Sequence, residues 1–255
     1  MLRLITIPIS HYCEKARWAL DRAQLPYREE GHVQVIHRVV ARRAGGGSTV
    51  PVLVADDGQV ISESADILDW VDRRLEPGTR LFEGEDAGAA RALCARLDER
   101  LGPTGRRLIY VHVFARGKAM LDYNNQGVPR WEDRALRAMW PLAQRAVSRL
   151  LDIRPGVEVQ DEAAVRAEFD NVAALLADGR PYLFGERFGG ADLTFAALAA
   201  PVIAPIDYGV RLPRPDEIGA ATAGLVQRFR EHPAGAFAVR MVAEHRRAPA
   251  LAATA

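Results

Sequence analysis

The spacing of apolar residues changes at Pro8, where the pattern of a strand gives way to that of a helix. The stretch from Leu2 to Ile7 is mostly apolar and stops at proline, which predicts a short buried strand. Beyond it, apolar side chains recur at helical spacing, at Cys13, Ala16, Leu20 and Ala23. A strand is therefore expected to run into a helix that begins near Ser10.

The next segments predict one more strand, followed by a basic stretch whose secondary structure the pattern does not decide. Residues Pro26 to Val35 carry the pattern of a strand, which would complete a βαβ unit. The stretch from Ile36 to Ala44 fits either a basic helix or an irregular turn. Three glycines follow, Gly45 to Gly47, and their backbone freedom favours a mobile loop beside the start of the first helix.

A hairpin and a helix complete this part of the chain. Residues Val50 to Val54 and Gln59 to Ile61 flank the turn Asp56-Asp57-Gly58, which is typical of a β-hairpin. Ser64 then opens a helix whose apolar positions lie three and four residues apart, at Ile67, Leu68, Val71 and Leu75. The order βαβ-ββα predicts an α/β domain over residues 1–78.

The remainder of the chain has a different character. Residues 79–86 have the composition of a linker, and residues 87–248 predict an all-α domain because no alternating segment is found there. Prolines at 103, 141 and 155 predict breaks, residues 123–131 predict a loop, and residues 249–255 predict a disordered tail. The expected helices cover residues 87–120, 130–152, 161–177, 190–203, 218–231 and 237–245.

Composition and charge narrow the possible partners. The 255 residues carry a formal net charge of +1, so a nucleic acid or an acidic membrane is not an expected partner, whereas a small molecule or a protein is. The two cysteines, Cys13 and Cys94, form no disulfide framework or metal cluster, and no metal is expected. With no secretory signal after Met1 and no apolar run of 18 residues, a cytosolic protein is expected.

Ser10 is the first candidate for chemistry. A helix N-terminus offers unpaired N–H groups and a partial positive charge, and a serine hydroxyl there can donate one more hydrogen bond to an anion such as a thiolate. Lowering a thiol pKa from ~8.5 by about two units takes roughly 2.7 kcal/mol, of which the helix end supplies about 0.3–1 and a charged hydrogen bond about 1.5–3 kcal/mol. The alternative is that Ser10 only caps the helix.

The order of elements and four motifs resemble the glutathione transferase family over nearly the whole chain. Ser10-His11-Tyr12-Cys13 lies where thioredoxin-like relatives of that family carry Cys-x-x-Cys. The resemblance implies a thioredoxin-like amino-terminal domain, an all-α carboxy-terminal domain and, in serine-type members, a hydrogen bond from Ser10 to the thiolate of glutathione. Cys13 would then be a buried packing residue, with a redox role as the alternative.

Two further motifs imply the rest of a glutathione site. Thr49-Val50-Pro51 resembles the segment of the family with a cis-proline, in which the main chain of Val50 pairs with the peptide backbone of glutathione. Glu63-Ser64 resembles the family pair in which Ser64 caps a helix and receives the γ-glutamyl carboxylate while Glu63 takes the ammonium group. His37 and Arg38 could reach the glycyl carboxylate.

The fourth motif concerns folding. The segment from Phe184 to Leu193 resembles a family capping box in which Asp192 is retained, but Gly189 stands where a serine or threonine belongs. Glycine at an N-cap costs only a few tenths of a kcal/mol, so the helix is expected to form without the reciprocal hydroxyl bond.

The resemblance therefore implies a homodimeric enzyme, without a metal, that activates glutathione as a thiolate for attack on a small, apolar electrophile. The second substrate would lie between the domains against residues 108–114, with Tyr123 and Tyr208 as further candidates. His11 is either an ordinary first-turn residue or a group that tunes protonation near neutral pH. Two rival functions remain: a redox or lyase enzyme acting through Cys13, and a non-catalytic protein that binds ligands or partners.

Overall fold

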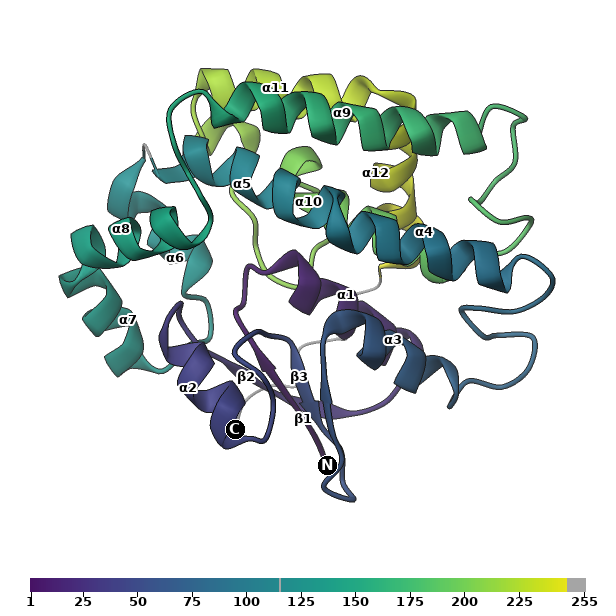
Figure 1. Cartoon of the computed structure of the whole chain (residues 1–255), viewed down its shortest axis with the longest axis horizontal. Helices are drawn as coiled ribbons and strands as arrows, with labels where there is room; N and C mark the ends of the chain where they lie inside the picture. The colour runs from purple at the N-terminus through teal and green to yellow at the C-terminus, as the bar shows by residue number, and fades with distance from the viewer. Residues whose placement is uncertain (115, 247–255) are drawn as a thin grey trace.

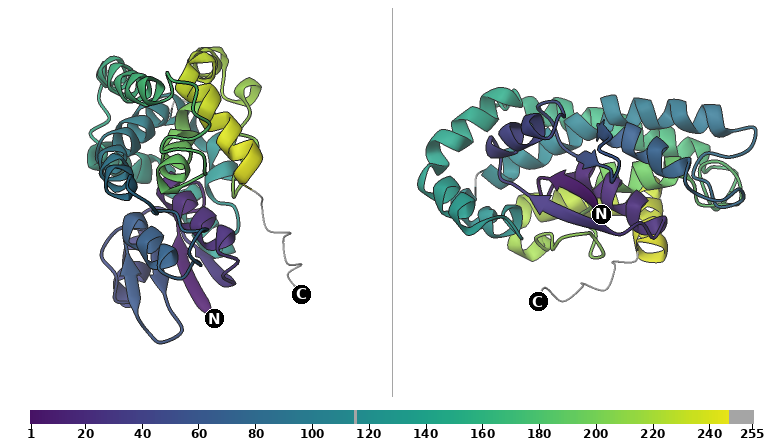
Figure 2. Two further views of the ribbon diagram at one scale, coloured as in Figure 1. Left: turned by 90° about the vertical axis from the view of Figure 1, so that its right-hand side faces the viewer. Right: turned by 90° about the horizontal axis from the view of Figure 1, so that it is seen from below.

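The computed structural model describes residues 1–114 and 116–246, so the tail predicted at 249–255 lies outside the described residues. A four-stranded sheet with three helices forms the amino-terminal part, and helices form the rest (Figure 1). The two parts stack on one another, with α1 between them (Figure 2). One continuous apolar core crosses from the sheet into the helical part.

The sheet has the order β2-β1-β3-β4. β1 runs parallel to β2 and antiparallel to β3, and β3 pairs with β4 as a hairpin. β2 ends at Gly31, earlier than the Val35 expected from the apolar pattern, because Val33 leaves the sheet and is buried against the helical part. The strands are β1 (Leu2–Thr6), β2 (Tyr27–Gly31), β3 (Val52–Val54) and β4 (Val60–Ser62).

Three helices belong to the amino-terminal part: α1 (His11–Arg22), α2 (Ile36–Arg43) and α3 (Ser64–Asp72). The ambiguous basic stretch is thus a helix. α1 packs against α3 on one side and against α10 of the helical part on the other. It is consequently buried on nearly all faces, including the charged residues Glu14, Lys15 and Arg17.

The helical part is built around α10, which is buried along almost its full length and packs against α1, α4, α5, α11 and α12. α6, α7 and α8 form a separate group beside α2 (Figure 1). These helices are α4 (Ala87–Glu99), α5 (Leu101–Phe114), α6 (Leu121–Asn124), α7 (Arg130–Ala138), α8 (Trp140–Leu150), α9 (Val157–Leu175), α10 (Gly190–Ile203), α11 (Ala220–Glu231) and α12 (Pro233–His245), with short 3₁₀ turns at Gly117–Met120 and Pro215–Glu217.

Two long helices expected from the sequence are each divided in the structure. Pro103 has no N–H to donate to the carbonyl of Glu99, so α4 ends at Glu99 and α5 begins at Leu101. Pro141 has the same effect, since α7 ends at Ala138 and Pro141 lies in the first turn of α8. The loop predicted at 123–131 is shorter than expected, because α6 includes its first two residues and α7 its last two.

No helix of the residues that the structure describes is both long enough and apolar enough to cross a membrane.

Candidate active site

The topology of the sheet brings the predicted site residues to one edge. Because β1 and β2 are parallel, their carboxyl ends share this edge, and they lead to Ser10 and to His37 respectively. Ile5 pairs with Val52, so the segment entering β3 through Val50 lies beside the end of β1. β4 is antiparallel to β3, so its end delivers Glu63 to the same place.

Ser10 is the N-cap of α1, as expected. Its Oγ accepts a long hydrogen bond of 3.4 Å from the N–H of Cys13. Within residues 1–114 and 116–246, the N–H groups of His11 and Tyr12 have no acceptor, and the Ser10 hydroxyl has the neighbouring Cys13 thiol as a hydrogen-bond partner. Three donors therefore converge at the positive end of a helix, an arrangement that suits an anion.

Cys13 is enclosed one turn into the helix and has no exposed surface. Burial raises the pKa of its thiol to about 11, against the smaller opposing effects of the Arg17 charge and of a hydrogen bond with Ser10. The thiolate is the reactive form of cysteine. At neutral pH Cys13 is thus a protonated packing residue without access to a substrate.

His11 is also buried, with only 3% of its surface exposed. Burial, assisted by the charge of Arg106, lowers the pKa of its imidazole to about 3. The ring is therefore neutral at neutral pH, and the idea that it tunes the protonation of the site in that range is wrong. Its Nε2 atom is buried without a hydrogen-bond partner among the described residues.

The Val50–Pro51 peptide bond is cis, as the resemblance implied. Neither the N–H nor the carbonyl of Val50 makes a hydrogen bond within the described residues, so this main chain can pair with another peptide. The neighbouring Thr49 hydroxyl donates to Glu63 Oε1 at 2.7 Å, which ties the cis-proline segment to the start of α3.

The Glu63-Ser64 corner differs in one detail from the expectation. Glu63 is the N-cap of α3, with φ of +68°, and Ser64 is the first helical residue, so Ser64 does not cap the helix. The reversed backbone at Glu63 turns the chain sharply from β4 into α3. It leaves the exposed Glu63 carboxylate next to the N–H groups of Ser64 and Ala65, which have no acceptor in the part of the chain that the structure describes. The corner thus presents an acceptor and donors side by side.

His37 lies in the first turn of α2 at the same edge of the sheet. Burial lowers the pKa of its imidazole to about 4, so at neutral pH the side chain offers a hydrogen bond and no charge. Its Nδ1 atom is buried and has no partner among residues 1–114 and 116–246. Arg38 follows it and is half-buried.

The helical part holds the loop between β2 and α2 by polar contacts that the sequence did not reveal. Glu132 of α7 is only 1% exposed, and it accepts hydrogen bonds from His32 Nδ1 at 2.8 Å and from the N–H of Val33 at 3.0 Å. Gln34 exchanges side-chain hydrogen bonds with Asn124 of α6. α6 and α7 thereby fix the segment that leads to His37.

A buried ionic cluster holds the turn that precedes Ser10. Arg17 donates to the carbonyl of Pro8 at 2.7 Å and pairs with Glu14 and Glu29. Glu14 also pairs with Arg246, after the end of α12. Burial opposes the charge on Glu14, but Arg17 and Arg246 outweigh it and hold the Glu14 pKa below its usual value. The turn is therefore positioned by charges from both parts of the chain.

Several residues expected to line a second-substrate cleft are buried or packed against neighbouring side chains. Leu108 is fully buried in the core, and Tyr208 is buried with its hydroxyl donating to the carbonyl of Ile9 at 3.3 Å. Tyr110 and Phe114 pack edge to face. Tyr123 lines a hollow of about 570 Å³, together with Met120 and Arg211, and none of the predicted glutathione-binding residues lines it.

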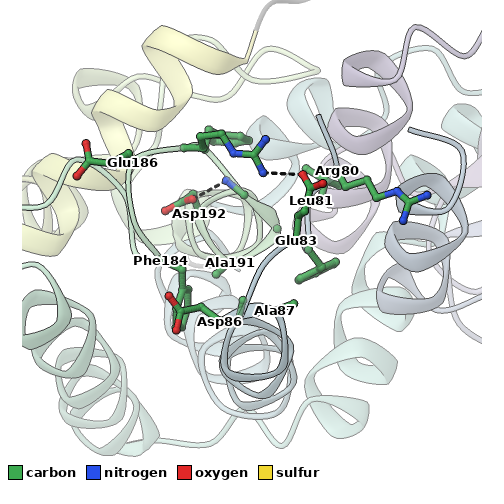
Figure 3. Close-up of a pocket in the computed structure, with 15 residues that line it drawn as sticks. Arg80, Leu81, Glu83, Asp86, Ala87, Phe184, Glu186, Ala191 and Asp192 are labelled. Atoms are coloured by element: carbon green, nitrogen blue, oxygen red, sulfur yellow. Dashed lines mark hydrogen bonds and ion pairs between the residues drawn. The ribbon is translucent and has the colours of Figure 1, made fainter. Parts of the chain in front are cut away.

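A second hollow, of about 260 Å³, lies between the linker and the start of α10 (Figure 3). It is lined by none of the predicted site residues. Asp192 accepts hydrogen bonds from the N–H groups of Gly189 and Leu183, so half of the capping box is present. A Cβ at Gly189 would lie 3.0 Å from the carbonyl oxygen of Leu81, which gives a physical reason for glycine where the family has serine or threonine.

Comparisons with known proteins agree with this arrangement. Residues 4–78 match the family model described as glutathione S-transferase, N-terminal domain. A comparison with curated protein sequences found no match.

Among solved structures, a glutathione S-transferase of Ceriporiopsis subvermispora in complex with glutathione is 16% identical, with 98% of this chain and 99% of that chain covered and a TM-score of 0.62. The glutathione transferase GSTFuA3 of Phanerochaete chrysosporium is 17% identical, with 97% and 98% covered and a TM-score of 0.63. Both similarities show a common fold along the whole chain. Residues 4–78 are therefore similar to the amino-terminal domain of glutathione S-transferases, and the whole chain shares the fold of these two solved structures.

Proposed function

We propose that this protein is a glutathione transferase that uses Ser10 to hold the sulfur of glutathione as a thiolate. The observation that carries the proposal is the pair of unsatisfied N–H groups at the start of α1, those of His11 and Tyr12, with the Ser10 hydroxyl beside them as a third donor. A buried or half-buried donor without an acceptor costs free energy, and an anionic sulfur would satisfy all three groups.

The other ends of the tripeptide have matching partners at the same edge of the sheet. The unpaired main chain of Val50, next to Pro51, suits the peptide backbone of glutathione. Ser64 and the first N–H groups of α3 suit the γ-glutamyl carboxylate, and Glu63 suits the ammonium group. His37 would donate a hydrogen bond to the glycyl carboxylate from a neutral ring.

The reaction needs little more from the protein. The thiol proton passes to solvent, the thiolate attacks an electrophilic carbon to form a carbon–sulfur bond, and a leaving group departs with the electron pair of the broken bond. The contribution of the chain is to ionise the sulfur and to position it. Residues 1–78 would hold glutathione, the helical part would shape the second-substrate region, and we expect a homodimer in the cytosol.

The Cys13 alternative has less support. Its thiol is enclosed and protonated at neutral pH, and the residue three positions earlier, which would be the attacking cysteine of a dithiol cycle, is Ser10. The non-catalytic alternative stays open to a direct test, because a chain that kept only the fold would have no reason to bind glutathione.

Calorimetric titration with glutathione tests the proposal. The wild-type protein should bind glutathione, and Glu63→Gln should weaken binding about tenfold because the ammonium group loses its charged acceptor. Glu76→Gln, an exposed acid beyond the end of α3, is the matched control and should bind like wild type. Absence of any binding by the wild-type protein would favour the non-catalytic alternative, and equal binding by both variants would remove Glu63 from the site.

A further inference from the structure

Arg106 of α5 is a half-buried cation without a counter-ion. Its Nε atom is buried and has no hydrogen-bond partner, and the side chain forms no ion pair with any residue in the ranges 1–114 and 116–246. The next residue along the helix behaves differently, since Arg107 makes two hydrogen bonds of 2.7 Å to Asp161. Burying the Nε donor without a partner is unfavourable, so Arg106 points to an anion supplied from outside the chain.

Several contacts place Arg106 next to the start of α1. Gly102, one helical turn earlier on the same face of α5, is so close to Tyr12 that a Cβ at that position would overlap the Tyr12 ring. The rings of His11 and Tyr12 lie 4.4 Å apart between centroids. The Arg106 charge helps to lower the His11 pKa and acts against the raised pKa of Tyr12, so the guanidinium lies near both side chains.

Arg106 belongs to a different part of the chain from the groups proposed for glutathione. The groups that suit the two carboxylates of glutathione, at the start of α3 and in α2, come from the amino-terminal part. Arg106 comes from the helical part, where its charge also acts on Tyr110 one turn further along α5. An anion bound by Arg106 would thus be held by the helical part, beside the start of α1 and by a different group from those proposed for the two carboxylates of glutathione.

We propose that Arg106 determines specificity by binding a carboxylate on the electrophile, so that this enzyme prefers anionic electrophiles to neutral ones. The proposal rests on the proposed function, and it replaces the apolar substrate expected from the sequence with an amphipathic one. A guanidinium suits a carboxylate because its N–H groups can donate two parallel hydrogen bonds. The chemistry itself is unchanged: the thiolate forms the carbon–sulfur bond and the leaving group takes the electron pair.

A matched pair of probes separates the charge from the reaction. Chlorodinitrobenzene is neutral and chlorodinitrobenzoate carries a carboxylate, and both lose chloride to glutathione. With Arg106→Gln, kcat/KM for the benzoate should fall about tenfold or more, mainly through KM, while that for the neutral probe stays within about twofold. Arg106→Lys should recover part of the loss because it restores the charge without the planar fork. Arg100→Gln, an exposed arginine between α4 and α5, is the control and should leave both rates unchanged.

Two outcomes would overturn the proposal. An equal loss with both probes, together with a raised pKa of bound glutathione, would mean that Arg106 supports the thiolate and not the electrophile. An unchanged preference would mean that Arg106 does not touch the second substrate.

A binding measurement distinguishes failure of this proposal from failure of the proposed function. Calorimetry with dinitrobenzoate, which cannot react, should show binding that weakens about tenfold in Arg106→Gln even if the protein turns over neither probe. Binding that is absent from the wild-type protein, or equal in the two proteins, would contradict an anion site at Arg106.

Discussion

The body of α1 and its start use polar groups in opposite ways. In the body of the helix, Glu14, Lys15 and Arg17 are buried and each charge is paired, Lys15 with Asp98 at 2.7 Å. At the start of the helix, the N–H groups of His11 and Tyr12 have no acceptor within the described residues. Paired buried charges hold the architecture, whereas unsatisfied donors mark the place where a ligand belongs.

The comparison also explains why the start of α1 can stay open. Arg17 holds the Pro8 carbonyl, Tyr208 donates to the Ile9 carbonyl, and Glu14 accepts from the N–H of Gly209 at 3.0 Å. The turn before Ser10 is thus fixed from behind, so the donors in front of it need no internal partner to keep their positions. Rigid support of this kind is what a preorganised anion site requires.

Substitution in the body of α1 should have the largest effect, and on stability. Glu14→Ala removes the acid shared by two buried arginines, so that Arg17 keeps Glu29 and Arg246 keeps Asp21. The free energy of unfolding should fall by about 3–5 kcal/mol. Chemical denaturation measures this loss. Glu30→Gln, which breaks the surface pair with Arg3, is the control and should cost no more than about 1 kcal/mol. Similar losses in the two variants would show that the buried cluster does not support the fold.

Lowering the pH should destabilise the folded protein because the imidazole of His11, at the start of α1, is buried and neutral. His11 has a pKa of about 3 in the folded state and ~6.5 when unfolded, so between these values the unfolded chain binds more protons. The contribution of neutral His11 to the free energy of unfolding is complete above pH ~6.5 and is lost as the pH falls toward about 3. By pH ~4 the loss should be of order 3 kcal/mol.

Equilibrium unfolding at several pH values checks this prediction, with His11→Gln as the comparison. The variant should lose less stability between pH ~6.5 and ~4, because glutamine does not titrate in this range. Identical slopes for the two proteins would contradict a buried neutral imidazole. His37, whose pKa is lowered to about 4, contributes in the same direction and stays in both proteins.

Much of the fold could be predicted from the sequence because local signals specify it. The apolar run before Pro8, the hairpin turn and the prolines at 103 and 141 each act on their immediate neighbours. The exact ends of elements were harder, since Val33 has a strand-like side chain but packs against α6 and α7 instead of entering the sheet. Tertiary contact decided that position.

The candidate site also contains residues that the sequence predicts and residues that it does not. Ser10, Pro51 and the Glu63-Ser64 corner stand out because the chain order and the resemblance place them at helix starts and a strand entrance. Arg106 and Glu132 could not be found from the sequence, because their partners, or the absence of partners among the described residues, depend on segments far away in the chain. In the sequence pattern of a helix, a buried charged residue cannot be distinguished from a solvent-exposed one.

The most direct test of the central claim is the ultraviolet titration of the thiolate of glutathione bound to the protein. In the wild-type protein the thiol should titrate well below its free value of ~8.5, and in Ser10→Ala its pKa should rise by about one unit, or ~1.4 kcal/mol. Cys13→Ser, which changes the buried neighbour, should titrate like wild type. An unchanged pKa in Ser10→Ala, or a shift in Cys13→Ser alone, would contradict the assignment of the thiolate to the start of α1.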